Sequence, residues 1–279
     1  METIKSLAED PRSVLNDARS RSRLRRKARD LAEAGNFVEA VTYQQALADI
    51  SPEDPQAFMD LGILHRAASE IEDAAVAFER AGALAPQTPD PHEAMAQMYL
   101  DVSRYDDAIK ECKALLRLIP HSLAARDILR SAYFQKGAIG KALAITEEMI
   151  RIAPYDPLSH YKQAVLHQHR NDWRNALDKF ITAAEMAPEE SLERYEAEAA
   201  IEALDQHQVR QILQLASEDR VFQLRLIRDV DEAVCDRGYS ISPAAMAFIG
   251  QVALSQIIDY SMERGADIYG RELRPQRYN

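Results

Sequence analysis

One proline recurs along this chain at a fixed interval of 34 residues. An alanine stands twelve residues before each of these prolines, and a large apolar residue stands three positions before each alanine. The prolines are Pro52, Pro86, Pro120, Pro154 and Pro188, the alanines are Ala40, Ala74, Ala108, Ala142 and Ala176, and the apolar residues are Phe37, Ile71, Tyr105, Ile139 and Trp173. An unbroken period of this length is typical of small structural units stacked in a row. The spacing therefore predicts five successive units.

The residue types at these positions predict that each unit is a pair of helices. A proline can close the second helix because its nitrogen carries no hydrogen to continue the helical ladder. An alanine fits where two helices cross closely, and a bulkier side chain there would cost about 1–3 kcal/mol of overpacking. Only 9 glycines and 7% aromatic residues occur among 279 residues, which favours helices over a barrel. The predicted fold class is all-α.

This pattern resembles the tetratricopeptide repeat, over residues 21 to about 190. The resemblance implies helix-turn-helix units, each with a helix A and a helix B, that stack into a right-handed superhelical solenoid. Unit one departs most from the family pattern, with Lys27 in place of leucine and Gln44 in place of an aromatic residue. The unit closest to the pattern is 55–88, where the matching residues are Phe58, Leu61, Gly62, Ala74, Phe78, Ala81 and Pro86.

The repeat divides the chain into four predicted parts. Residues 1–20 are expected to form an N-terminal capping helix, and residues 21–188 to form the five repeats. The 34-residue register is expected to stop after Pro188, so that residues 189–264 form a C-terminal helical domain that caps the solenoid or dimerises. Residues 265–279 are polar and basic, and we expect them to be a flexible tail.

Local signals predict the helices of the C-terminal part. We expect one helix over 191–206, a second over 209–216 and a third over 220–238 that ends at Gly238. Ser242 is a predicted N-cap with Pro243 in the first turn of the next helix. That helix is apolar on more than one stripe, so it is either buried on two faces or part of an interface, with Phe248, Val252 and Ile257 as candidate interface residues.

Two further resemblances concern this C-terminal part. Residues 228–249 are similar to leader-peptide-like segments of ribosomally made peptides, and residues 222–266 are similar to the first two helices of the histone fold. The second resemblance implies a helix pair that dimerises. The alternative is a helical cap on the open end of the solenoid.

Catalytic and metal-binding patterns are not found in the sequence. It has no HExxH, CxxC or glycine-rich phosphate loop, and two cysteines are too few for a disulfide framework. The register places His65, His92, His160 and His167 at packing positions between helices, and Cys112 at a position that Phe78 and Phe180 fill in other units. We therefore expect no catalytic residues, no cofactor and no metal.

A binding groove is the better candidate, because solenoids of this kind commonly use the concave face lined by their A helices. Positions 2, 5, 9, 12 and 13 of each unit, counted from residue 21 in the first, are predicted to face it. The family's clamp for a C-terminal carboxylate is absent, since it needs basic residues and an asparagine at these positions. The candidate groove residues are Arg25, Arg29, Met59, Ile63, Arg66, Glu93, Gln97, Asp127, Ser131, Phe134, Tyr161 and Val165.

The predicted groove changes from basic to acidic to apolar along the chain, which suits a protein segment of mixed charge with an apolar end. The alternative for the apolar end, with Phe134, Tyr161 and Val165, is cover by the chain's own C-terminal helices. The predicted function is a non-enzymatic adaptor or scaffold that binds a protein or peptide segment.

A second hypothesis is nucleic-acid association through the basic run Arg19–Arg29, which has seven cations in eleven residues, perhaps in a homodimer formed by the C-terminal helices. A net charge of -11 opposes extensive wrapping of nucleic acid. No secretory signal and no apolar run of membrane-spanning length occurs, so we expect a cytoplasmic protein with no membrane contact.

Overall fold

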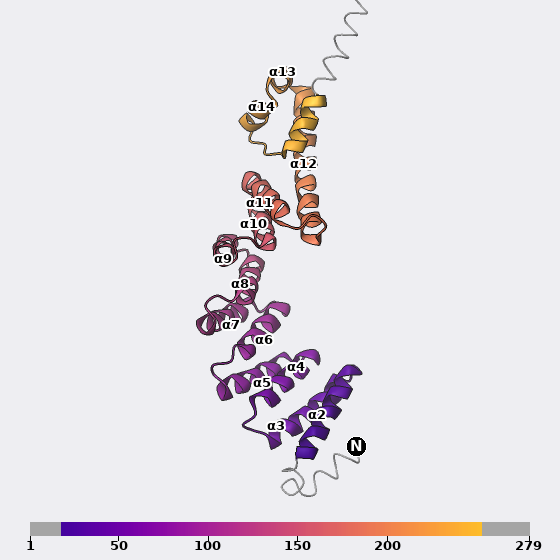
Figure 1. The fold of residues 1–279 in the computed structure, drawn as a ribbon, viewed down its shortest axis with the longest axis vertical. Helices are drawn as coiled ribbons and strands as arrows, with labels where there is room; N and C mark the ends of the chain where they lie inside the picture. Colours follow the sequence, from indigo (N-terminus) through magenta and orange to yellow (C-terminus); the bar gives the residue numbers. More distant parts are fainter. Residues whose placement is uncertain (1–17, 253–279) are drawn as a thin grey trace, which may run out of the picture. The chain divides into compact units, whose positions relative to one another are not determined.

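The structure is a computed structural model, and it describes residues 18–252 (Figure 1). This part of the chain contains helices and no strand. The helices are α2 (Ala18–Glu33), α3 (Phe37–Ile50), α4 (Pro55–Ala67), α5 (Ile71–Leu84), α6 (Asp90–Asp101), α7 (Tyr105–Leu118), α8 (Leu123–Gln135), α9 (Ile139–Ile152), α10 (Pro157–His169), α11 (Trp173–Met186), α12 (Leu192–Glu218), α13 (Arg220–Arg228) and α14 (Val230–Asp236), followed by a helical segment over residues 243–252.

The five predicted helix pairs are confirmed. The A helices are α2, α4, α6, α8 and α10, and the B helices are α3, α5, α7, α9 and α11. Each B helix begins at the large apolar residue of the register and ends two residues before the repeat proline. The five crossing alanines all have 0% of their surface exposed. The crossing therefore leaves no room for a larger side chain, as the sequence predicts.

The turns between helices A and B also follow the 34-residue period. Position 15 of every unit has a left-handed backbone, with φ between 58° and 78°. The residues at this position are Gly35, Ser69, Ser103, Gly137 and Asn171. Glycine adopts this conformation at no steric cost and asparagine tolerates it, so two glycines and an asparagine suit the turn.

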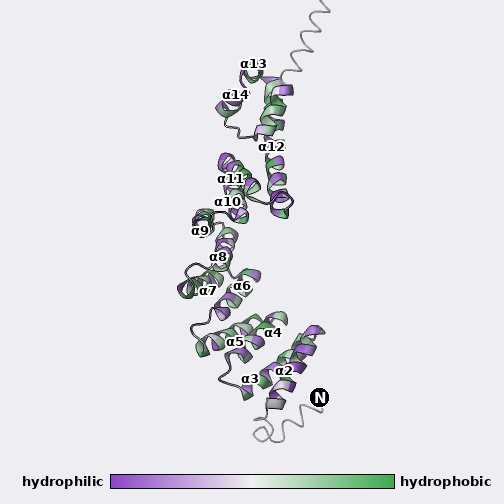
Figure 2. Cartoon of the chain, in the orientation of Figure 1, coloured by the Kyte–Doolittle hydropathy of each residue, from purple (hydrophilic) through white to green (hydrophobic). Residues whose placement is uncertain are grey.

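The chain forms two compact units, residues 1–145 and residues 146–279, and α9 runs from the first into the second. The main core of the first unit lies between α5, α6, α7 and α8, with Phe78 and Met98 fully buried in it. In the second unit, one core joins the end of α12 to α13, α14 and the segment 243–252, around Phe222, Leu226 and Ile249. Apolar and polar residues alternate along the helices in the way that such one-sided packing requires (Figure 2).

The predicted end of the register at Pro188 is wrong. A sixth A helix would begin 34 residues after Pro157, and α12 begins at Leu192, with Ser191 as its N-cap. It packs against α11, and its Ala197 is fully buried, like the residues at the same register position in α4, α6 and α8. It then continues for 27 residues, so that the two helices predicted over 191–206 and 209–216 are one.

The helix predicted over 220–238 is divided at Asp229. The Asp229 carboxylate accepts a hydrogen bond from the Glu232 N–H, 2.9 Å away, and so caps a new helix. Asp219 caps α13 in the same way, and hydrogen bonds from the Phe222 and Val221 N–H groups lower its pKa. The chain beyond α14 agrees with the prediction, since Gly238 has a φ of 79°.

The predicted cap at Ser242 is also confirmed. Its hydroxyl accepts a hydrogen bond from the Ala245 N–H at 3.2 Å. The Ser242 N–H donates to the Asp205 carboxylate at 2.8 Å, and the Ser240 N–H donates to the Gln208 side chain at 2.8 Å. These bonds fix the loop before residues 243–252 to the middle of α12. Residues 1–17 of the predicted capping helix, the candidate interface residue Ile257 and the predicted tail 265–279 lie outside the described residues.

Candidate functional site

Two hollows lie on the A helices of the first unit. The first has a volume of about 300 Å³ and lies between α2 and α4. Arg25 and Arg29 bring two cations to it, and Asp60 brings one carboxylate. Its remaining lining is Ala28, Ala32, Gln44, Ile63 and Leu64. The hollow thus combines an apolar floor with a rim on which positive charge predominates.

The second hollow also has a volume of about 300 Å³, and it is formed by α4, α6 and α8. Asp90 and Glu93 bring two exposed carboxylates, while Arg66 brings one cation. No ion pair involves Asp90 or Glu93 within residues 18–252. Gln97, Ala94 and Ile128 complete the lining. The charge balance is therefore the reverse of that in the first hollow.

These hollows contain half of the predicted groove residues. Arg25, Arg29 and Ile63 line the first, and Arg66, Glu93 and Gln97 line the second. Met59 packs against the core of the first unit instead. The other predicted residues of this unit line neither hollow: Asp127 pairs with Arg130 at 2.9 Å, the Ser131 hydroxyl accepts a hydrogen bond from Arg130 at 3.0 Å, and Phe134 is half-buried.

Tyr161 and Val165 belong to the second unit, where α12 covers part of α10. Both side chains pack into a cluster with Phe180, Leu204 and Ile201. The alternative that the chain's own C-terminal helices cover this face is therefore what the structure shows for these two residues. Of the candidate interface residues on 243–252, Phe248 is 49% exposed and Val252 is half-buried.

The sequence reasoning missed one lining position. Asp60, Ala94 and Ile128 are 34 residues apart at position 6, and each lines a hollow from the following helix A. The groove positions were assigned one helix at a time, whereas a hollow is formed by two or three neighbouring helices. Adding position 6 to the groove positions would have found them.

The basic run forms the exposed surface of α2. Leu24, Ala28 and Leu31 are buried, and every cation from Arg21 to Arg29 is exposed. Lys27 stands where Leu61, Met95 and Leu129 are buried against a preceding helix B in other units. The other departure from the family pattern, Gln44, is buried and donates a hydrogen bond to the Ala57 carbonyl at 2.9 Å.

Four histidines lie at the packing positions and are also hydrogen-bonded. The ring of His65 pairs with Glu70 at 2.7 Å, and that of His167 pairs with Asp172 at 3.0 Å, across the same turn of units two and five. His92 pairs with Glu111 at 2.7 Å, and His160 is 3.1 Å from the Pro154 carbonyl. The polar atoms of these histidines therefore help to fix helices to their neighbours.

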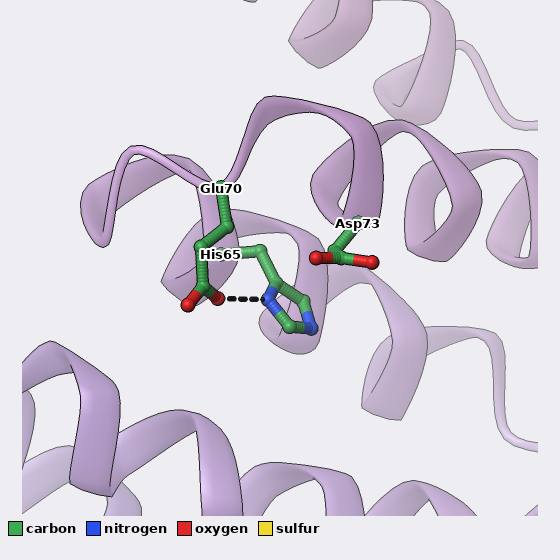
Figure 3. Close-up of side chains that lie close together, drawn as sticks. All are labelled: His65, Glu70 and Asp73. Carbon is green, nitrogen blue, oxygen red and sulfur yellow. Dashed lines mark hydrogen bonds and ion pairs between the residues drawn. The ribbon is translucent and has the colours of Figure 1, made fainter.

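Unit two adds Asp73 to this arrangement, so that ligand atoms of His65, Glu70 and Asp73 lie within 4.8 Å of one another (Figure 3). The pair at the same turn of unit five has Asn175 in place of the third carboxylate, and hydrogen bonds from Asn175 and His167 lower the pKa of Asp172. Because the histidine–acid pair occurs there without a third acid, we interpret it as a connection between helices A and B.

The two cysteines differ in reactivity. Cys112 is fully buried, and burial raises the pKa of its thiol to about 12, whereas Cys235 is exposed. Only the thiolate attacks disulfide reagents. We expect the native protein to release one equivalent from such a reagent at pH 8, with Cys112 on the order of a hundredfold slower.

This is measured by the absorbance of the released thiolate, before and after unfolding in guanidinium. The Cys235→Ser variant is the control, and it should leave the native chain almost unreactive. Two fast thiols in the native protein would contradict the assigned burial of Cys112.

Comparison with protein families agrees with the observed geometry. Residues 25–89 match the model of the tetratricopeptide repeat family. The chain is a tetratricopeptide repeat protein. No curated protein sequence gives a significant match. None of the helices in residues 18–252 is long and apolar enough to span a membrane.

Solved structures of tetratricopeptide repeat proteins share the fold at low sequence identity. MamA 41-end from Desulfovibrio magneticus RS-1 is 18% identical, covers 60% of this chain and 94% of its own, and has a TM-score of 0.52. Another MamA structure is 15% identical over 61% of this chain and 93% of its own, with a TM-score of 0.53. YrrB, described as a TPR protein with an unusual peptide-binding site, is 14% identical over 70% of this chain and 97% of its own, with a TM-score of 0.51.

Proposed function

We propose that this tetratricopeptide repeat protein is a non-enzymatic scaffold that binds a protein segment across the A helices of its first unit. The observation that carries the proposal is the pair of hollows on successive A helices, one rimmed mainly by arginines and the next mainly by carboxylates. Concave surfaces with an apolar floor and a few charged groups are the usual form of a recognition site. The peptide-binding site described for YrrB supports the same use of the fold.

The charges define the partner. A carboxylate side chain of the segment would lie beside Arg25 and Arg29, with an apolar neighbour against Ile63 and Leu64. A lysine or arginine further along the segment would lie beside Asp90 and Glu93. Opposite charges placed in this order select both the partner and its direction, because a reversed segment would bring like charges together.

The test uses a phage library of random twelve-residue peptides, selected on the full chain. We expect selected peptides to contain an acidic and a basic residue, and Arg25→Glu/Arg29→Glu to weaken their binding at least about tenfold, or 1.4 kcal/mol. Fluorescence anisotropy with labelled peptides measures the affinity.

The matched control is Arg23→Glu/Arg26→Glu, on the same helix and with the same change of charge but outside the hollow. It should change the affinity less than about threefold at 150 mM salt. Equal losses in the two variants would show that α2 attracts anions non-specifically, as the nucleic-acid hypothesis requires, and would contradict a site in the hollow.

A further inference from the structure

A four-residue pattern occurs twice in the second unit, at an interval of 34 residues. Leu158 and Tyr161 lie in the first turns of α10, and Leu192 and Tyr195 lie in the first turns of α12. Both pairs have the form Leu-x-x-Tyr and stand at positions 2 and 5 of the register. Because α12 is a sixth A helix in its first half, the two pairs lie on corresponding faces of neighbouring helices.

Contacts between the two helices support this placement. Tyr161 packs against the cluster that contains Ala197 and Ile201 of α12. Burial raises the pKa of the Tyr161 phenol, and the Glu196 carboxylate, next to Tyr195 in the chain, raises it further. The first turns of α12 therefore lie beside the first turns of α10.

These apolar side chains are exposed to an unusual degree. Leu192 is 67% exposed, Tyr195 is 71% exposed, and Leu158 is 41% exposed. At 100° per residue, Leu192 and Tyr195 lie on the side of α12 opposite to buried Ala197 and Leu204. Single exposed apolar residues are ordinary, but a pair repeated on two adjacent helices forms a continuous apolar patch of the kind that marks an interaction site.

The surroundings of this Leu-Tyr face are acidic. Residues 188–205 contain seven carboxylates and a single cation, Arg194, which pairs with Glu198 at 2.9 Å. Glu193 and Glu196 are exposed on either side of Tyr195 in the sequence, and Glu189 and Glu190 are exposed just before Leu192. An apolar patch with an acidic border complements apolar side chains flanked by lysine or arginine.

We propose that the Leu-Tyr face, formed by Leu158, Tyr161, Leu192 and Tyr195, docks a protein segment in which leucine or aromatic residues are flanked by cations. This surface belongs to the second unit and is separate from the two hollows of the first. The segment places its apolar side chains against Leu192 and Tyr195 and its cations beside Glu193 and Glu196. Basic segments without apolar residues do not bind there, because a contact between exposed charges alone is weak in salt.

The test selects random twelve-residue peptides on the full chain and sorts them by the variants that abolish binding. Peptides of the Leu-Tyr face are expected to lose at least tenfold in affinity with Leu192→Asp/Tyr195→Asp, and to keep their affinity with Arg25→Glu/Arg29→Glu. They should carry lysine or arginine next to leucine or an aromatic residue. Glu193→Lys/Glu196→Lys is expected to weaken them by about threefold to tenfold.

The matched control is Val38→Asp/Val76→Asp, which replaces side chains that are 69% and 66% exposed on B helices of the first unit. It should leave all peptides bound, and circular dichroism should show unchanged helix content in every variant. Selection of no peptide sensitive to Leu192→Asp/Tyr195→Asp would overturn this proposal, while peptides sensitive only to Arg25→Glu/Arg29→Glu would leave the proposed function standing.

A synthetic peptide of residues 270–279 serves as a competitor, because it carries three arginines together with Leu273 and Tyr278. If it displaces the library peptides at equal concentration, the occupant is the chain's own C-terminal sequence, and the proposal of a separate partner is overturned. If it does not compete, a partner of the stated chemistry is supported.

Discussion

Replacing Phe78 by alanine is expected to lower the free energy of unfolding by about 3–5 kcal/mol, because it removes a large side chain from a core that cannot close around the space. Phe78 is fully buried among Ala74, Met98 and other residues of the first unit. The change is measured by urea unfolding followed by circular dichroism. The melting temperature should fall by roughly 10 °C.

The control for this variant lies two residues away on the same helix. Val76 is 66% exposed, so Val76→Ala should change the free energy of unfolding by less than about 0.5 kcal/mol. If the two variants unfold at the same urea concentration, Phe78 is not in the core that the structure describes.

Gly62→Ala is expected to destabilise the protein by about 1–3 kcal/mol, although the same change inside a helix usually stabilises it. A Cβ atom on Gly62 would lie 2.6 Å from two carbons of the Phe78 ring and 2.9 Å from a third. The ring is buried and cannot move aside without disturbing the core. The glycine is therefore required by the phenylalanine opposite it.

A double-mutant cycle tests this dependence directly. In a Phe78→Ala background, Gly62→Ala should become neutral or stabilising, by up to about 1 kcal/mol, since the clash is gone. Gly140→Ala is the matched control, because a Cβ at Gly140 meets nothing within 4 Å. Additive effects of the two substitutions would show that the ring does not occupy this space.

The bounds of the B helices could be predicted from the sequence because two constraints act at fixed places. The crossing alanines permit one close approach in each unit, and each proline follows the end of a helix B, so the period determines both ends. The same reasoning failed for α12, where Asp205 occupies position 15. Earlier units have glycine, serine or asparagine there, in a left-handed turn, whereas Asp205 remains helical and binds Ser242.

The candidate site was only partly predictable for a related reason. Charges on one helix can be assigned from the register, and this placed Arg25, Arg29 and Glu93 correctly on the A helices. Which residues share a hollow depends on the next helix, and Asp60 and Ile128 enter from there. The Leu-Tyr face was missed because it depends on a sixth helix A that follows the last repeat proline.

The way the register ends affects how such a chain can change in length. α12 begins as another helix A, packs on the helix B before it, and then runs on to hold residues 219–252 through Asp205 and Gln208. Every B helix in the chain presents the same crossing alanine, so a duplicated or deleted block of 34 residues before Pro188 would still present α12 with an equivalent surface. The number of repeats and the terminal assembly can therefore change independently of each other during evolution.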